Sequence, residues 1–298
     1  MKSLLKDQLS GPGGPLQGKK ILKISSVHGG CIHNSWLIEL NDGQKLFAKT
    51  TSIKKFKLLE FELIGLTDLQ NYADKSFLTI PKPFKVQMLE NNSVLLMPWL
   101  NFSQGSESKL GKGLALLHKL SAERSPGKFG YDKDGFIGLN PQISGWDENW
   151  GEFFVEYRLI PQLTFAQKWG LDLSDNNLIL VKLKSFLESH KPLPSIVHGD
   201  LWKGNSSIDE EGKGIIFDPA VYWGDREVDL AMTKLFGGFS NDFYEAYEKT
   251  WPLPISSRER IEIYNLYHLL NHANMFGGEY KKQCLISLKN ISEMLNDN

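Results

Sequence analysis

The stretch HGDLWKGN at positions 198–205 constrains this chain more than any other feature, and it is followed by the apolar run 215–217 and then by Asp218. Phosphoryl transfer needs an acceptor hydroxyl held in line, a carboxylate near its proton, and divalent metal to neutralise the phosphates. Asp200 fits the role of proton acceptor. Asn205 and Asp218 supply two oxygen ligands for magnesium. The pattern therefore predicts a phosphoryl-transfer site.

The spacing within this stretch supports that interpretation. The interval from Asp200 to Asn205 matches the D-x-x-x-x-N of the protein kinase catalytic loop, although Gly199 stands where kinases have arginine. The alternative is a polar turn between two buried strands, in which the Asp and Asn side chains only cap the backbone. Short motifs carry false positives. The position of Asp218, directly after the next apolar run, favours the catalytic interpretation.

The composition sets bounds on partners and location. Lysine plus arginine number 34 against 35 aspartate plus glutamate, so no basic field indicates nucleic acid, and small substrates are favoured. The two cysteines, Cys31 and Cys284, cannot form a disulfide framework, and the first residues lack the apolar core of a signal peptide. No apolar run approaches the roughly 20 residues needed to span a bilayer. We expect a soluble cytoplasmic protein, either monomer or homodimer.

The N-terminal third of the chain predicts a small β-rich lobe. A glycine- and proline-rich stretch at 10–15 ends a short helix around Leu4 and Leu9. Strand patterns follow, and the Asn-Asp-Gly at 41–43 between two of them is a strong hairpin signal. Between residues 52 and 72 the apolar spacing becomes helical. The predicted strands lie at 21–25, 35–40, 45–50, 83–89 and 94–97.

From residue 108 onward the pattern is chiefly helical, with one β interruption at 196–217 that carries the catalytic stretch. A β-rich lobe hinged to a larger helical lobe is the α+β, bilobal architecture of protein kinases, with ATP in the cleft between lobes. We expect a nucleotide-binding lobe at 1–98 and a catalytic and substrate lobe at 99–298. The predicted helices lie at 108–122, 150–169, 176–190, 226–236, 242–249, 258–274 and 281–296.

Lys49 ends the third predicted strand, where a kinase places the lysine that binds the α- and β-phosphates. Its expected partner is a carboxylate on the following helix. Glu60 and Glu62 both qualify by position, but residues two apart on a helix point in different directions, so only one faces the cleft, and we favour Glu62. The alternative is a solvated lysine and two surface glutamates, in a helix that also carries Lys54, Lys55 and Lys57.

The turn at 25–32, between the first two strands, contains Gly29, Gly30 and Cys31. Its glycines permit close approach of backbone N–H groups to the phosphates of a nucleotide. The turn lacks G-x-G-x-x-G, and an ordinary hairpin loop has a similar composition. Cys31 is either a small apolar residue or a thiol accessible to oxidants.

Aromatic and histidine residues near the catalytic stretch complete the candidate site. Trp202 lies two residues after Asp200, and a flat aromatic wall suits a sugar or an alkylamine. The alternative is a tryptophan buried in the helical lobe. We place His198 with it on the substrate side. His268 and His272 are four apart on one helical face, but no third ligand accompanies them, so packing or hydrogen bonding is the favoured role.

Taken together, these motifs resemble the fructosamine-3-kinase (ketosamine-3-kinase) family, which has the protein-kinase-like fold and is related to aminoglycoside phosphotransferases. The resemblance covers nearly the whole chain. It rests on residues 29–32, 47–49, 61–62, 81–83, 95–97, 138, 146–153, 158–159, 198–205, 216–220, 235–239 and 271–272.

The resemblance implies ATP- and Mg²⁺-dependent phosphorylation of the third sugar hydroxyl of ketosamines, either small molecules or glycated proteins, which destabilises the adduct and leads to deglycation. It also implies that Met97 and Trp99 line the nucleotide pocket. Pro98 stands where some relatives carry an acidic hinge residue, and residues 225–229 read Asp-Arg-Glu-Val-Asp. We expect neither departure to touch the catalytic set.

Two other functions remain open at this point. A kinase of another hydroxylated amine, such as an aminoglycoside or choline, would need an acidic acceptor pocket for a polycation. A non-catalytic nucleotide-binding regulator would have lost one of the four central residues, and Lys49, Asp200, Asn205 and Asp218 are all present.

Overall fold

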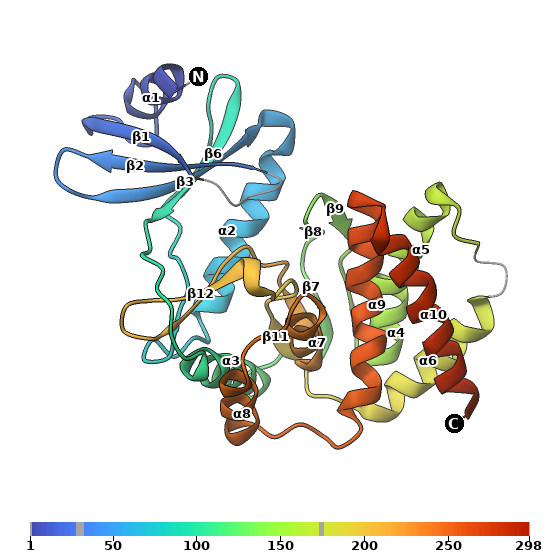
Figure 1. Cartoon of the computed structure of the whole chain (residues 1–298). Coiled ribbons are helices and arrows are strands. Elements are labelled where there is room, and N and C mark those ends of the chain that lie inside the picture. Colours follow the sequence, from blue (N-terminus) through green and yellow to red (C-terminus); the bar gives the residue numbers. More distant parts are fainter. Residues whose placement is uncertain (1, 28–32, 173–175, 298) are drawn as a thin grey trace.

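The computed structural model describes residues 2–27, 33–172 and 176–297. A five-stranded sheet forms the N-terminal part of the molecule, and helices with short strands form the rest (Figure 1). This is the α+β, kinase-like architecture expected from the sequence. No helix in the described part of the chain is long and apolar enough to cross a membrane.

The N-terminal sheet is antiparallel and has the order β1-β2-β3-β6-β5. The Asn-Asp-Gly turn between β2 and β3 places Gly43 at φ 83°, a left-handed conformation that glycine adopts without strain. Helix α1 (Lys2–Ser10) buries Leu5 and Leu9 against one face of the sheet. The strands are β1 (Ile21–Val27), β2 (Asn34–Leu40), β3 (Lys45–Ser52), β5 (Lys85–Met88) and β6 (Asn92–Pro98).

Helix α2 (Phe56–Gln70) follows β3 after a single 3₁₀ turn, Ile53–Lys55. Its buried face combines apolar side chains such as Leu59 and Leu66 with one carboxylate, Glu62. A buried carboxylate among leucines requires a charged partner, which β3 supplies. The predicted helix at 52–72 and the five predicted strands are thus confirmed within a few residues.

The predicted helices of the C-terminal part are also confirmed. The segment 150–169 is helical throughout but contains a π turn, Val155–Leu159, in which Arg158 is buried and lies 4.0 Å from the centre of the Tyr222 ring. A π turn is uncommon in proteins, and this one accompanies the burial of the Arg158 side chain. The helices are α3 (Ser108–Ala122), α4 (Trp150–Phe154), α5 (Ile160–Ala166), α6 (Asn176–His190), α7 (Glu227–Leu235), α8 (Asn241–Thr250), α9 (Ser257–Phe276) and α10 (Glu279–Asp297).

The expectation of a single β interruption in the C-terminal part is wrong. A four-stranded sheet, β10-β7-β14-β11, and a separate hairpin, β8-β9, lie among the helices. Each strand has three residues, which is too short for alternation to be visible in the sequence. These strands are β7 (Phe129–Tyr131), β8 (Gly135–Ile137), β9 (Asn140–Gln142), β10 (Gly145–Asp147), β11 (Ser195–Val197) and β14 (Tyr222–Gly224). The remaining sheet joins β12 (Ser206–Ile208) and β13 (Gly214–Ile216) to β4 (Leu78–Thr79).

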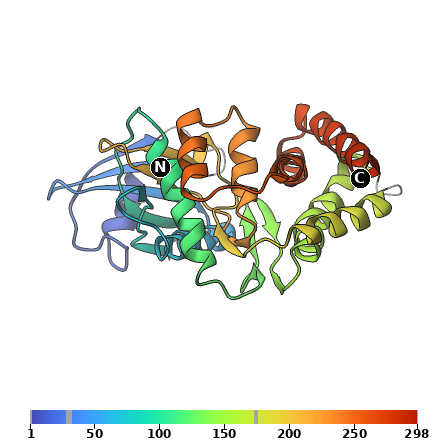
Figure 2. The ribbon, with the colours of Figure 1, turned by 90° about the horizontal axis from the view of Figure 1, so that it is seen from below.

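Helices α3 and α8 lie side by side, as Figure 2 shows from below. The contact is close because Gly111 of α3 has no side chain. A Cβ atom there would lie 2.1 Å from the carbonyl oxygen of Phe243 in α8. The backbone of one helix therefore packs directly on the other.

The variant Gly111→Ala should lower the free energy of unfolding by roughly 1–3 kcal/mol, because the new methyl group forces the two helices apart. This loss should exceed the gain of up to about 1 kcal/mol in helix propensity. Gly105→Ala is the matched control, since a Cβ there meets no atom within 4 Å. Urea unfolding curves measure both. Equal stability of the two variants would contradict the close contact.

Candidate active site

The stretch 198–205 forms the loop between β11 and β12, and its last turn, Lys203–Asn205, is 3₁₀. Gly199 has φ 79°, and a Cβ atom there would lie 2.2 Å from the carbonyl oxygen of Ala220. Only glycine fits both conditions. This explains why glycine, and not arginine, precedes Asp200 in this chain.

Asp200 and Asn205 contact each other across this loop. The Asn205 side-chain amide donates to the Asp200 backbone carbonyl at 2.9 Å and to Asp200 Oδ2 at 3.1 Å. The other carboxylate oxygen, Oδ1, is buried without a hydrogen-bond partner. Burial, with a further contribution from the Asp218 charge, raises the pKa of Asp200 to about 7. The carboxylate is thus set up to accept a proton near neutral pH.

Asp218 follows β13 and meets the lysine of β3. Its backbone is left-handed, with φ 59°, which is uncommon for a residue other than glycine and typical of functional sites. Its carboxylate accepts from the Lys49 ammonium. Lys49 also donates to Glu62 Oε1 at 2.7 Å. The structure therefore pairs Lys49 with Glu62, and not with Glu60.

Lys49, Glu62 and Asp218 differ in their exposure to solvent, and this difference shifts their pKa values. The side chains of Lys49 and Glu62 are only 7% and 9% exposed, whereas Asp218 keeps 39% of its surface exposed. Burial opposes the ammonium form, but the two carboxylates outweigh it and raise the pKa of Lys49. Burial raises the pKa of Glu62 more than the ammonium lowers it.

Burial also works against the ionised form of Asp218, yet the adjacent ammonium of Lys49 keeps the pKa of this carboxyl below its ordinary value. Two carboxyl groups, those of Glu62 and Asp218, thus contact the one ammonium, and the charge of Asp218 also acts on Asp200. Asp200 Oδ1 has no partner. The carboxylate oxygens of Asp200 and Asp218 form a negatively charged set of donors, and not all of them have a hydrogen-bond partner. Such a set fits a hard divalent cation such as magnesium.

His198, the first residue of this loop, is fully buried. Burial lowers its pKa, so the ring is neutral at pH 7. A neutral ring with the proton on Nε2 satisfies both contacts. Nε2 donates to the Phe217 carbonyl at 2.9 Å, and Nδ1 accepts from the Asp200 backbone N–H at 3.3 Å. His198 thus connects the catalytic loop to the residue that precedes Asp218.

The expectation that residues 225–229 do not touch the catalytic set is wrong. Asp229 of α7 is fully buried and accepts from the backbone N–H groups of His198 at 2.7 Å and Gly199 at 2.8 Å. It also lies 3.0 Å from Nε2 of His118 in α3. Sequence reasoning missed this anchor because nothing in its spacing relates it to the loop. Its only signal is an acidic residue on the apolar face of a helix.

Trp202 is partly buried and packs edge-on against Phe236, with ring centres 6.1 Å apart. Phe236 in turn packs on His272 at 4.6 Å. His272 also bonds through Nδ1 to the backbone carbonyl of His268 at 2.8 Å, whereas the His268 ring packs on Tyr267 and has no hydrogen-bond partner, so His272 hydrogen-bonds and His268 packs. Trp202 therefore joins the loop to an aromatic cluster formed by the end of α7 and by α9.

Two further candidates, Met97 and Trp99, lie at the end of β6 or directly after it. Met97, near the end of β6, is buried and pairs with Phe47 of β3. Trp99 follows it and packs at 6.3 Å from the Phe47 ring, while its Nε1 donates to Asn101 at 3.0 Å. Gly29, Gly30 and Cys31 lie outside the described residues.

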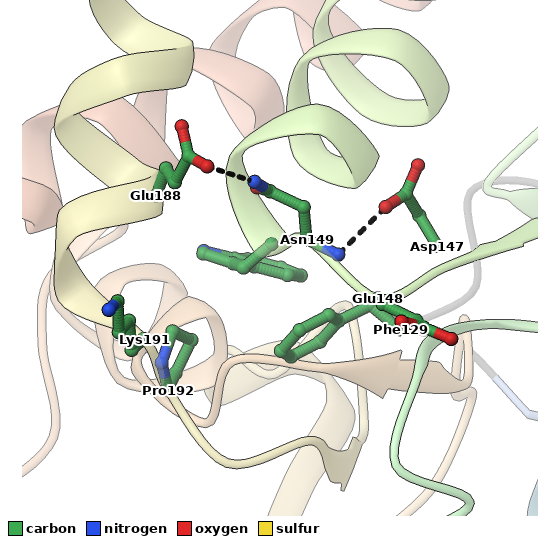
Figure 3. A pocket seen from close by; sticks show the side chains of 8 residues that line it. Phe129, Asp147, Glu148, Asn149, Glu188, Lys191 and Pro192 are labelled. Carbon is green, nitrogen blue, oxygen red and sulfur yellow. Dashed lines mark hydrogen bonds between the residues drawn. The ribbon is translucent and has the colours of Figure 1, made fainter.

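A cavity of about 390 Å³ lies away from this group, where β7 and β10 meet the ends of α4 and α6 (Figure 3). Asn149 stands at its centre. Its side chain donates to Glu188 at 2.7 Å and caps α4 by accepting from the Glu152 backbone, and its own N–H donates to Asp147 at 2.7 Å. None of the residues predicted to form the active site lines this cavity.

The fructosamine kinase family matches residues 9–294 of the chain. The chain belongs to the fructosamine kinase family. It is 37% identical to a Synechocystis protein assigned as a ketoamine kinase, covering 91% of this chain and 90% of that protein. It is 34% identical to the chloroplastic protein-ribulosamine 3-kinase of rice, covering 93% and 80% of the two chains.

Solved structures agree with this membership. The crystal structure of a protein assigned as a fructosamine-3-kinase from Haemophilus somnus has a TM-score of 0.83 and 29% identity, covering 92% of both chains. The aminoglycoside phosphotransferase APH(4)-Ia is 12% identical with a TM-score of 0.61, over 93% of this chain and 95% of that one. The second likeness shows the fold alone.

The raised pKa of Asp200 predicts a pH-dependent effect on stability. In the unfolded chain the carboxyl titrates at its ordinary value of 3.8, and in the folded protein at about 7. Its protonated form is favoured by folding, so stability is lost as the pH rises through about 7. In metal-free buffer, Asp200→Asn should gain roughly 1–3 kcal/mol relative to wild type between pH 5 and pH 8.

Asp7→Asn, at an exposed position of α1, is the control that removes one carboxyl group outside the buried site. Thermal unfolding at pH 5 and pH 8 measures the difference. A gain for Asp200→Asn that is the same at both pH values would show that Asp200 ionises normally in the folded protein.

Proposed function

We propose that this protein transfers the γ-phosphoryl group of ATP to the third sugar hydroxyl of ketosamines, on small molecules or on glycated proteins. The observation that carries the proposal is the meeting of Lys49, Glu62 and Asp218 with the Asp200 loop, in a chain of the fructosamine kinase family. The rice relative is named for the same position of transfer on ribulosamines.

On the nucleotide side, residues 1–98 would bind ATP and residues 99–298 would carry the acceptor. Lys49, held by Glu62, is proposed as the cation for the α- and β-phosphates, and Met97 and Trp99, at the end of β6 and directly after it, are proposed to line the site of the base. Gly29, Gly30 and Cys31 are proposed to cover the phosphates. Asn205 and Asp218 would hold magnesium, which neutralises phosphate charge when bound.

On the acceptor side, Asp200 orients the sugar hydroxyl and accepts its proton. Because the transition state of phosphoryl transfer is loose, position matters as much as basicity. His198 is fully buried, so we propose that it acts on the substrate indirectly, by holding the Asp200 loop against Phe217. Trp202, on the same loop, offers an aromatic face to the sugar or the alkylamine.

The product chemistry tests this assignment. A phosphate on the third carbon lies next to the ketone, so it is eliminated as inorganic phosphate once the adduct enolises toward the amine-bearing carbon. Water then hydrolyses the resulting imine and releases the amine. With fructosyl-lysine and Mg-ATP we expect a phosphorylated intermediate that decays without enzyme to lysine, inorganic phosphate and a deoxydicarbonyl sugar. Mass spectrometry follows all three species.

Asp200→Asn is the catalytic control for this experiment and should reduce turnover roughly 100-fold. A stable phosphorylated adduct with no amine release would reject phosphorylation of the third hydroxyl, even if the protein were an active kinase.

The pairing of Lys49 supplies a second test. Glu62→Gln removes the buried partner of the ammonium and should lower kcat/KM for ATP roughly tenfold or more. Glu60→Gln makes the same chemical change two residues earlier on the same helix, where no contact with Lys49 exists, and should leave kcat/KM unchanged. Steady-state kinetics at saturating acceptor measure both variants. Equal effects of the two substitutions on kcat/KM would show that the Lys49–Glu62 ion pair does not contribute to nucleotide binding.

A further inference from the structure

A small groove lies between the start of α2 and the β8-β9 hairpin. It has a volume of about 210 Å³. We name it the lysine groove, and its lining combines three ammonium groups with three apolar side chains: Lys54, Lys55, Lys57, Leu58, Phe136 and Leu139. All three lysines are exposed, as is Leu139.

The β8-β9 hairpin joins this groove to the two segments that carry Glu62 and Asp218. Phe136 packs edge-on against Phe61, the residue before Glu62, with ring centres 6.3 Å apart. Gln142, at the end of the hairpin, donates to the carbonyl of Ala220, two residues after Asp218, at 3.1 Å. In Figure 1 the hairpin lies between α2 and the end of α9.

The charge of the groove is uncompensated. Among the described residues, no carboxylate forms an ion pair with Lys54, Lys55 or Lys57. The positive charge also reaches toward the active site. Burial is the main cause of a pKa of about 4 at His33, and the charges of Lys49 and Lys55 lower it further. His33 therefore lies within the electrostatic reach of both the catalytic lysine and the groove.

We propose that the lysine groove binds a carboxylate carried by the amine portion of the acceptor, beside a short apolar chain. This inference rests on the proposed function and names its substrate class: ketosamines formed by amino acids that keep a free carboxylate. The volume suits one amino-acid-sized group, the ammonium groups suit its carboxylate, and Leu58, Phe136 and Leu139 suit its side chain. Three like charges disfavour polycationic acceptors.

The experiment compares two acceptors that differ only in charge: the fructose adducts of leucine, with a free carboxylate, and of leucinamide, with a neutral amide. Wild type should show about tenfold higher kcat/KM for the leucine adduct, since exposed ion pairs contribute modestly and three act together. The preference should shrink in 0.5 M salt, because the lysines are exposed to screening.

The triple variant K54Q/K55Q/K57Q should remove this preference and leave kcat/KM for the leucinamide adduct within about twofold. K2Q/K6Q/K20Q, on α1 and just before β1, removes the same number of charges elsewhere and should retain the preference. Calorimetric titration of both adducts separates binding from turnover.

The outcomes distinguish failure of the lysine groove as a carboxylate site from failure of the proposed ketosamine kinase activity. The proposed role of the lysine groove would be overturned by equal kcat/KM for both adducts in wild type, by equal losses for both adducts in K54Q/K55Q/K57Q, or by a preference for the leucinamide adduct. Each of these outcomes leaves ketosamine phosphorylation in place. No turnover of either adduct would reject the proposed function and this inference with it.

Discussion

The ammonium of Lys49 is the contact on which the rest of the site depends. It joins β3, helix α2 and the turn after β13, which are separated by up to 169 residues in the chain. A buried ammonium needs carboxylate partners, and the buried Glu62 carboxylate would be unstable in an apolar interior without it. The pairing therefore fixes how the N-terminal sheet, through β3 and α2, meets the catalytic loop.

A second buried charge network supports the loop from below. Arg260 forms two hydrogen bonds to Glu227, both at 2.8 Å, and His190 lies 3.1 Å from Asp225. His190, Asp225 and Glu227 also have the spacing of a metal site, but the arginine occupies both glutamate oxygens. We therefore interpret the group as an ion-pair network that positions the start of α7. Its role follows from Asp229, in the first turn of the same helix, which accepts hydrogen bonds from the backbone of the catalytic loop.

Much of this arrangement could be predicted from the sequence, because its signals are local. The hairpin turn at 41–43, the helical spacing of α2 and the interval from Asp200 to Asn205 each lie within one short segment. Helix geometry also indicated that only one of Glu60 and Glu62 could face Lys49, and the structure agrees with the preference for Glu62.

What could not be predicted depends on contacts between distant segments. Three-residue strands are held by neighbouring strands and have no periodicity of their own. In the sequence Asp229 resembles any acidic residue of a helix, and only the packing of α7 against the catalytic loop reveals its hydrogen bonds to the loop backbone. Likewise, Lys54, Lys55 and Lys57 look like a solvated helix start, and only the packing of the β8-β9 hairpin turns them into one wall of a groove.

The close approach of Gly199 to Ala220 has a consequence for motion. Together with the bonds of His198 to Phe217 and of Ala220 to His198, at 2.9 and 2.8 Å, it makes the catalytic loop and the Asp218 turn a single rigid body. Lys49 and Glu62 belong to β3 and α2, outside this body. A movement of β3 and α2 relative to it would then separate one ion pair, Lys49–Asp218, while Asp200, Asn205 and Asp218, the proposed proton acceptor and metal ligands, keep their mutual distances.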